Sequence, residues 1–128
     1  MKKEAIITII IIILILAGEW ITQNYTNKKL SKLQEDLSSL KEEILAENDV
    51  DTLIQKTEDI YNNWEKENEI LSYYLEHNEL EKVNTQIILI KGYLESDAPQ
   101  DSIPDLEEGI YILEHIKEKE AFNLKNIF

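Results

Sequence analysis

Two histidines are the residues of this sequence best suited to chemistry, and each has a glutamate about one helical turn away. His77 precedes Glu81 by four positions, and His115 precedes Glu118 by three. On a helix both spacings place the two side chains on one face, where an imidazole and a carboxylate could share a metal ion. Metal sites in helical bundles use Glu-x-x-His pairs, but a tyrosine and an isoleucine stand three residues before these histidines. We therefore predict no metal site and no cofactor.

Other kinds of catalysis lack candidates as well. The sequence has no cysteine, which removes thiolate nucleophiles, disulfides and zinc–thiolate sites, and its 3 glycines form no phosphate-binding loop. No acidic residue stands on an apolar stripe, where burial would raise its pKa. Asp97, Asp101 and Asp105 are spaced like an acidic loop, yet the central glycine of a calcium loop is missing. We predict that the protein is not an enzyme.

The charge of the chain narrows the class of partner. Its 128 residues include 26 acidic residues against 13 basic ones, for a net charge of -13, and every basic residue is lysine. Such a surface repels phosphate backbones, so we expect no nucleic-acid partner. The part of the chain beyond its first segment, about 100 residues, is long enough to bury one core without disulfides.

The first segment has the pattern of a membrane anchor. Lys2 and Lys3 precede an uncharged, isoleucine-rich run over residues 5–18. A cleaved signal peptide would need a pair of small residues at its cleavage site, which is missing, and a lipoprotein signal would need cysteine where Glu19 stands. An uncleaved anchor over residues 1–21 fits better, although the apolar run is shorter than the roughly 20 residues of a typical span. Its main positions are Ile6, Ile9, Ile13, Leu16 and Trp20, with the tryptophan at the interface.

The lysines on the two sides of this segment give conflicting signals about orientation. Lys2 and Lys3 favour a cytoplasmic N-terminus, whereas Lys28, Lys29 and Lys32 favour the opposite. Short leading anchors usually insert with the N-terminus inside, and an acidic domain is translocated readily. We expect a single-pass protein of the cell membrane with its domain on the extracytoplasmic face.

Beyond the anchor, apolar residues recur at three- and four-residue spacing, which is typical of amphipathic helices. No proline or glycine occurs between Glu19 and Gly92, so the anchor helix should continue out of the membrane. Asp49 or Asp51 can cap a second helix, and His77 would end it, beside a turn at His77-Asn78. The pattern predicts helices over about residues 22–47, 51–77, 79–95 and 103–124, with a loop at residues 96–104.

The predicted fold is all-α. An N-terminal transmembrane helix over residues 1–21 continues into a compact antiparallel four-helix bundle over residues 22–128. The first bundle helix carries the stripe Leu30, Leu33, Leu37, Leu40 and Ile44. This stripe either packs on the other three helices or pairs with another chain, and we favour the first because three helices alone would leave the core incomplete. The stripe of the fourth helix extends to Leu124, and further core positions are Trp64, Leu71, Leu75, Ile87 and Leu113.

Several short motifs together resemble one bacterial family. They are the basic start with its isoleucine-rich segment, Trp64 late in the second helix, the turn His77-Asn78-Glu79-Leu80 and the tail Leu124-Lys125-Asn126-Ile127-Phe128. In these features the chain is similar to the family called domain of unknown function 4363. The resemblance covers nearly the whole chain. It implies a short single-pass bacterial membrane protein, accompanied by a multi-pass membrane protein encoded beside it, and it assigns no catalytic residue.

These patterns lead to one functional hypothesis and two alternatives. The hypothesis is a non-catalytic, membrane-anchored interaction or accessory protein, which presents an acidic helical bundle to a membrane or envelope protein. One alternative is a bitopic coiled-coil scaffold that pairs through the stripe from Leu30 to Ile44. The other is a ligand-sensing helical module that acts through a membrane partner. The remaining expected partners are the lipid bilayer and, through weak association, a second copy of the chain.

Overall fold

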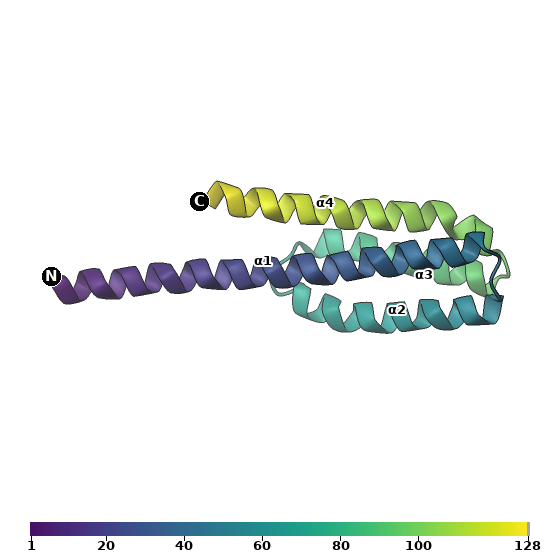
Figure 1. Cartoon of the computed structure of the whole chain (residues 1–128), viewed down its shortest axis with the longest axis horizontal. Coiled ribbons are helices and arrows are strands. Elements are labelled where there is room, and N and C mark those ends of the chain that lie inside the picture. The colour runs from purple at the N-terminus through teal and green to yellow at the C-terminus, as the bar shows by residue number, and fades with distance from the viewer. Residues whose placement is uncertain (128) are drawn as a thin grey trace.

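The computed structural model describes residues 1–127, apart from the side chains of Leu124, Asn126 and Ile127. Its elements are α1 (Lys2–Leu45), α2 (Val50–Leu71), α3 (His77–Glu95), the short 3-10 helix η1 (Pro99–Ser102) and α4 (Ile103–Ile127). The four α-helices alternate in direction and pack side by side (Figure 1). The structure confirms the predicted all-α fold, with a long apolar N-terminal helix and four helices packed against one another.

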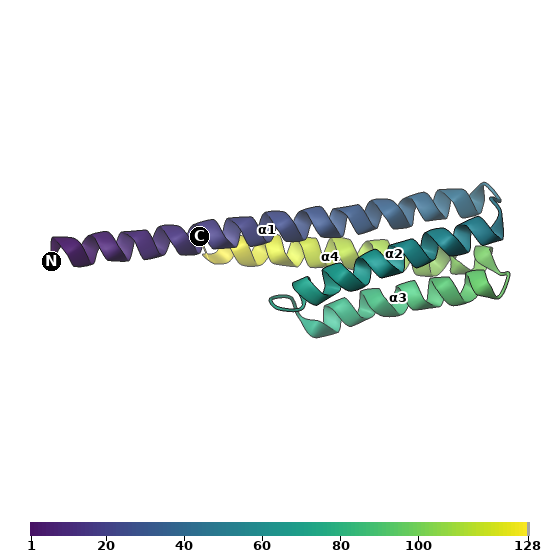
Figure 2. The same cartoon turned by 90° about the horizontal axis from the view of Figure 1, so that it is seen from below.

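A single helix joins the apolar segment to the bundle. α1 runs without interruption through 44 residues, so the predicted anchor and the first bundle helix are one element. At a rise of 1.5 Å per residue this helix is about 66 Å long. Figure 2 shows its N-terminal part projecting beyond the other helices, while the rest of α1 lies along them.

The ends of α1 and α3 share one stop signal. Glu47 follows α1 with φ 58°, and Asp97 follows α3 with the same angle. After α1, the Asn48 N–H donates to the Glu43 carbonyl and the Glu47 N–H to the Ile44 carbonyl, which is a Schellman motif. A non-glycine residue in this left-handed conformation carries backbone strain, so neither end is optimal for stability.

The turn between α2 and α3 lies earlier than predicted. α2 begins as expected, with the Asp49 carboxylate accepting a hydrogen bond of 3.2 Å from the Thr52 N–H. It ends at Leu71, however, so the predicted end at residue 77 and the turn at His77-Asn78 are wrong. After Leu71 the backbone forms a short turn, with hydrogen bonds from the Tyr73 N–H to the Ile70 carbonyl and from the Tyr74 N–H to the Leu71 carbonyl. This turn keeps Leu75 buried in the core. His77 therefore begins α3 and does not interact with the negative end of the α2 dipole.

One core fills the space between the four helices. The whole stripe from Leu30 to Ile44 is buried within the same chain, and Trp64 is 2% exposed. Leu71, Leu75, Ile87 and Leu113 are buried in the same cluster, whereas the side chain of Leu124 lies outside the described residues. Burial of this apolar area is the main stabilising contribution to the bundle.

Gly109 allows α4 to pack closely on α1. A Cβ atom added at this position would stand 3.3 Å from Leu37 Cδ1 and 3.7 Å from Gln86 Cβ. The absent side chain thus brings together three helices at one level of the core. The sequence pattern did not assign this glycine a packing role.

Candidate functional site

The exposed half of α1 is the most distinctive surface of the molecule. Residues from Ile6 to Leu16 form an apolar helix that packs on no other element over most of its length, with isoleucines about half exposed. Among the described residues, one helix is long and apolar enough to cross a membrane, and it is α1 near the N-terminus. A water-soluble core cannot account for an apolar helix that is exposed on all faces. The part of the bundle next to this segment is therefore the candidate functional site, which we call the anchor-proximal end.

A tyrosine–carboxylate–lysine contact joins α1 to α2 at the anchor-proximal end. The Tyr25 hydroxyl donates a hydrogen bond to Glu67, and the Lys29 Nζ lies 3.3 Å from the other oxygen of the same carboxylate. Lys29 also lies over the Tyr25 ring, 5.5 Å from its centroid. The hydrogen bond to Glu67, with smaller contributions from burial and the Glu67 charge, raises the pKa of Tyr25 to about 12.

A second polar contact joins α1 to the α2–α3 turn. Thr26 is buried, and its hydroxyl donates to the Thr22 carbonyl and lies 2.8 Å from the Tyr74 hydroxyl, with which it also forms a hydrogen bond. This contact places the α2–α3 turn just beyond the end of the predicted anchor at residue 21. The sequence pattern gave no indication of it, because Thr26 and Tyr74 are 48 positions apart.

Glu120 contradicts the expectation that no acidic residue lies on an apolar stripe. It follows Leu113 and Ile116 on the inward face of α4 and is partly buried. Burial raises the pKa of Glu120; Lys119 opposes this shift, and the negative charges of Glu19 and Glu76 add to it. The neighbouring Lys119 Nζ lies 2.9 Å from Glu76 Oε1, so α4 reaches the level of the α2–α3 turn. Figure 1 shows the C-terminal end of α4 lying along α1, past the α2–α3 turn.

Three aromatic side chains at the anchor-proximal end are each more than 60% exposed, and each comes from a different element. Trp20 on α1 is 67% exposed, Tyr73 in the α2–α3 turn is 83% exposed and Phe122 on α4 is 61% exposed. We call these three residues the aromatic collar. Only Trp20 was predicted to lie at a membrane interface, because the positions of the other two depend on how the helices align.

Charge is distributed unevenly along the bundle axis. Gln34 on α1 marks the middle, since its side-chain amide donates to the Ile110 carbonyl at 3.2 Å and to Glu114 at 3.0 Å. The distal half, residues 35–61 and 86–113, contains 15 acidic residues and 3 lysines. The anchor-proximal half, residues 19–34, 62–85 and 114–125, contains 10 acidic residues and 8 lysines. Most of the negative charge of the bundle therefore lies far from the apolar segment.

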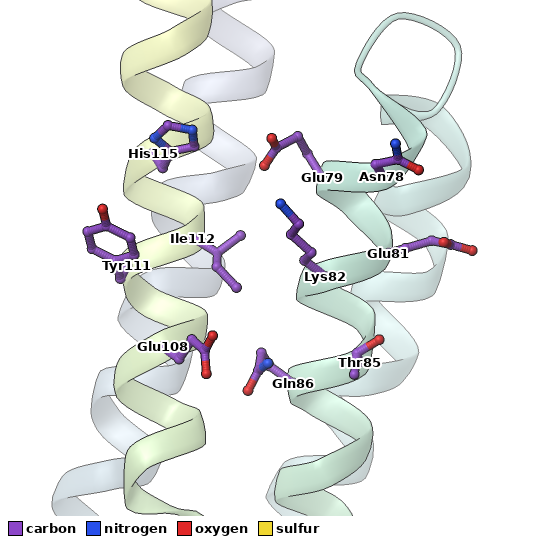
Figure 3. Close-up of a pocket in the computed structure, with 10 residues that line it drawn as sticks. All are labelled: Asn78, Glu79, Glu81, Lys82, Thr85, Gln86, Glu108, Tyr111, Ile112 and His115. Atoms are coloured by element: carbon purple, nitrogen blue, oxygen red, sulfur yellow. The ribbon is translucent and has the colours of Figure 1, made fainter.

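The two histidines lie on α3 and α4, in the anchor-proximal half of the bundle. His77 Nε2 is 3.1 Å from Glu81 on the exposed surface of α3. His115 lines a groove of about 790 Å³ between α3 and α4, opposite Glu79 and Lys82 (Figure 3). Within residues 1–127 no group of three or more His, Asp or Glu side chains could hold a metal ion. The groove is open and lined mainly by polar side chains, so its geometry indicates no particular reaction.

Comparison with known proteins places the chain in a family without assigning an activity. No curated protein and no solved structure matches it. A family model matches residues 20–127, from Trp20 at the end of the apolar segment to the end of α4, and this match confirms the resemblance seen in the sequence motifs. The resemblance also used the C-terminal tail, residues 124–128. Phe128 and the side chains of Leu124, Asn126 and Ile127 lie outside the described residues. The chain belongs to the family described as Domain of unknown function (DUF4363).

Proposed function

We propose that this protein is a non-catalytic, membrane-anchored interaction protein, which holds its helical bundle on the extracytoplasmic face of the cell membrane and contacts a membrane or envelope protein there. The observation that carries the proposal is the continuity of α1. Its first half is an exposed apolar helix, and its second half supplies one of the four stripes of the bundle core. A helix shared in this way couples the bundle rigidly to the membrane, because bending α1 would break core contacts.

The burial of the stripe from Leu30 to Ile44 favours this proposal over a coiled-coil scaffold. A scaffold paired through that stripe would need it exposed, but Leu30, Leu37 and Leu40 are at most 1% exposed within one chain. Pairing through the stripe would require the bundle to open, with loss of its main apolar contacts.

The surface that suits a protein partner best lies over α3 and α4. Leu89 and Tyr93 continue the helical face of Lys82 and Gln86, which line the groove, toward the distal end. Ile88, Leu89 and Tyr111 are exposed apolar or aromatic side chains on these two helices. Exposed apolar residues beside a groove are typical of a protein contact, in contrast to the charged face of α2.

Cross-linking in intact membranes tests this proposal. A photoreactive amino acid at Leu89 or Tyr111 should give a discrete cross-linked product, to be identified by mass spectrometry. The same amino acid at Asn62, exposed on α2, is the matched control and should give none. Cross-linking at neither α3 nor α4, with equal expression and membrane content, would contradict a partner on this face.

A further inference from the structure

The anchor-proximal end exposes aromatic rings where a soluble bundle would have polar residues. Trp20, Tyr73 and Phe122 come from three elements that are distant in sequence, yet all lie near the boundary of the apolar segment. The Thr26–Tyr74 hydrogen bond places Tyr73 beside α1, and the ion pair of 2.9 Å between Lys119 and Glu76 places α4 beside the α2–α3 turn. Phe122 lies three residues further along α4. Figure 2 shows the end of α4 beside α1, in agreement with the first view.

We propose that this end of the bundle is itself a lipid-binding surface, seated in the headgroup layer of the bilayer that α1 spans, with the aromatic collar as its contact. This inference rests on the membrane anchoring proposed above. Tyrosine and tryptophan are enriched at membrane interfaces, where an apolar ring lies among acyl chains and a polar group reaches water. Phe122 supplies the apolar part of the same contact.

The length of the apolar segment gives an independent reason. Residues 5–21 form a helix of about 26 Å, which is shorter than the hydrocarbon core of about 30 Å. The headgroup layer adds about 5–7 Å on each side of that core, and Thr26 lies about 7 Å beyond Ile21 along α1. Because Thr26 is bonded to Tyr74, a bilayer of ordinary thickness reaches the α2–α3 turn and therefore the collar.

The distribution of charge supports the same contact between the anchor-proximal end and the lipid headgroups. Eight lysines offset most of the 10 acidic residues in the anchor-proximal half, whereas the distal half has only 3 lysines for 15 acidic residues. An anionic headgroup layer attracts lysines and repels carboxylates within about a Debye length. Lys28 on α1 and Lys125 on α4 are both exposed at this end and can reach lipid phosphates. An upright bundle thus keeps most of its acidic residues away from the lipid.

Spin labels on single cysteines test directly whether the collar lies at the membrane interface, since the full chain has no cysteine of its own. The variants are Trp20→Cys, Tyr73→Cys, Phe122→Cys and Tyr111→Cys, each in vesicles of phosphatidylcholine and phosphatidylglycerol. Tyr111 is the matched control because it is 71% exposed on the same helix, about 16 Å from Phe122 along the axis. Accessibility to oxygen relative to an aqueous nickel complex reports the depth of each label.

We expect interfacial depth at positions 73 and 122 and full aqueous exposure at position 111. An aqueous label at position 20 would show that α1 does not span the bilayer, so the anchoring itself would fail. A membrane-inserted label at position 20 with aqueous labels at positions 73 and 122 would overturn the proposed lipid contact of the collar but not the anchoring. Labels at 73 and 122 shielded from both reagents would assign the collar to a protein contact and would also overturn it.

A second experiment tests whether the rings of the collar hold the end of α4 at the membrane. A label at Lys125→Cys is measured with and without the double change Tyr73→Ser and Phe122→Ser. Loss of the two rings should move the label at position 125 toward water, while circular dichroism stays unchanged. An unchanged depth at position 125 would show that the rings do not hold the end of α4 at the membrane.

Discussion

Thr26 and Tyr74 are joined by a hydrogen bond of 2.8 Å between their hydroxyl groups, which ties the α2–α3 turn to α1 directly beyond the apolar segment. Thr26 is buried, so Tyr74→Phe leaves its hydroxyl with only the bond to its own helix. We expect a loss of about 1 kcal/mol in the free energy of unfolding. Urea unfolding of the full chain in micelles measures this change. Tyr111→Phe is the control, since its exposed ring has no comparable bond, and an equal effect of both changes would contradict the assigned role.

Glu120 should reduce stability at neutral pH. Its folded-state pKa is raised above the ordinary glutamate value, mainly by burial. The unfolded chain therefore releases this proton at lower pH than the folded chain, and the penalty is complete above the folded pKa and absent below the unfolded one. Glu120→Gln should raise the midpoint of unfolding at pH 7 and have no effect at pH 3. A destabilised Glu120→Gln at pH 7 would show that the carboxylate makes a favourable contact.

Truncation of Trp64 should lower the stability of the bundle strongly. Trp64 is 2% exposed, and its Nε1 is buried without a hydrogen-bond partner. Trp64→Ala should lower the free energy of unfolding by about 3–5 kcal/mol, and Trp64→Phe by less, because phenylalanine has no polar atom to bury. Trp20→Ala, outside the core, is the control. A loss below about 1 kcal/mol for Trp64→Ala would show that the side chain is not packed.

The left-handed residues after α1 and α3 offer a gain in stability. Glu47 and Asp97 both have φ 58°, a conformation that glycine adopts without strain. Glu47→Gly should raise the free energy of unfolding by about 0.5–1 kcal/mol, whereas Glu47→Val should lower it, because a branched side chain is strained there. Chemical unfolding of the two variants side by side gives the sign. Equal stability of both would mean that α1 ends differently.

The apolar stripes and the fold class could be predicted because they depend on local spacing. Trp64 and Leu71 are seven residues apart on α2, and Ile87 lies four residues after Val83 on α3, so their inward direction follows from periodicity alone. The α2–α3 turn was missed because no glycine or proline marks it, and the His77-Asn78 pair pointed to a later boundary. Secondary-structure ends are set by core closure as much as by local signals.

The candidate site could be predicted only in part, since it depends on how distant segments align. Trp20 lies in the predicted anchor and has the pattern of an interfacial residue. Tyr73 and Phe122 carry no such local signal, and they join Trp20 only because the α2–α3 turn and the C-terminal part of α4 both lie beside α1 near the end of its apolar segment. The inward position of Glu120 was in principle visible, as it lies four residues after Ile116 on a predicted stripe.

Maleimide labelling followed by intact-mass measurement tests membrane anchoring and orientation together. Asn62→Cys, exposed on α2 and outside the proposed partner surface, is treated in intact cells with a membrane-impermeant maleimide. The intact mass of the protein in the membrane fraction is then measured by mass spectrometry. An uncleaved α1 with the bundle outside predicts one species, the complete chain with one label. A mature chain that begins near Glu19 would contradict the anchor, and a complete chain that is labelled only after lysis would place the bundle in the cytoplasm.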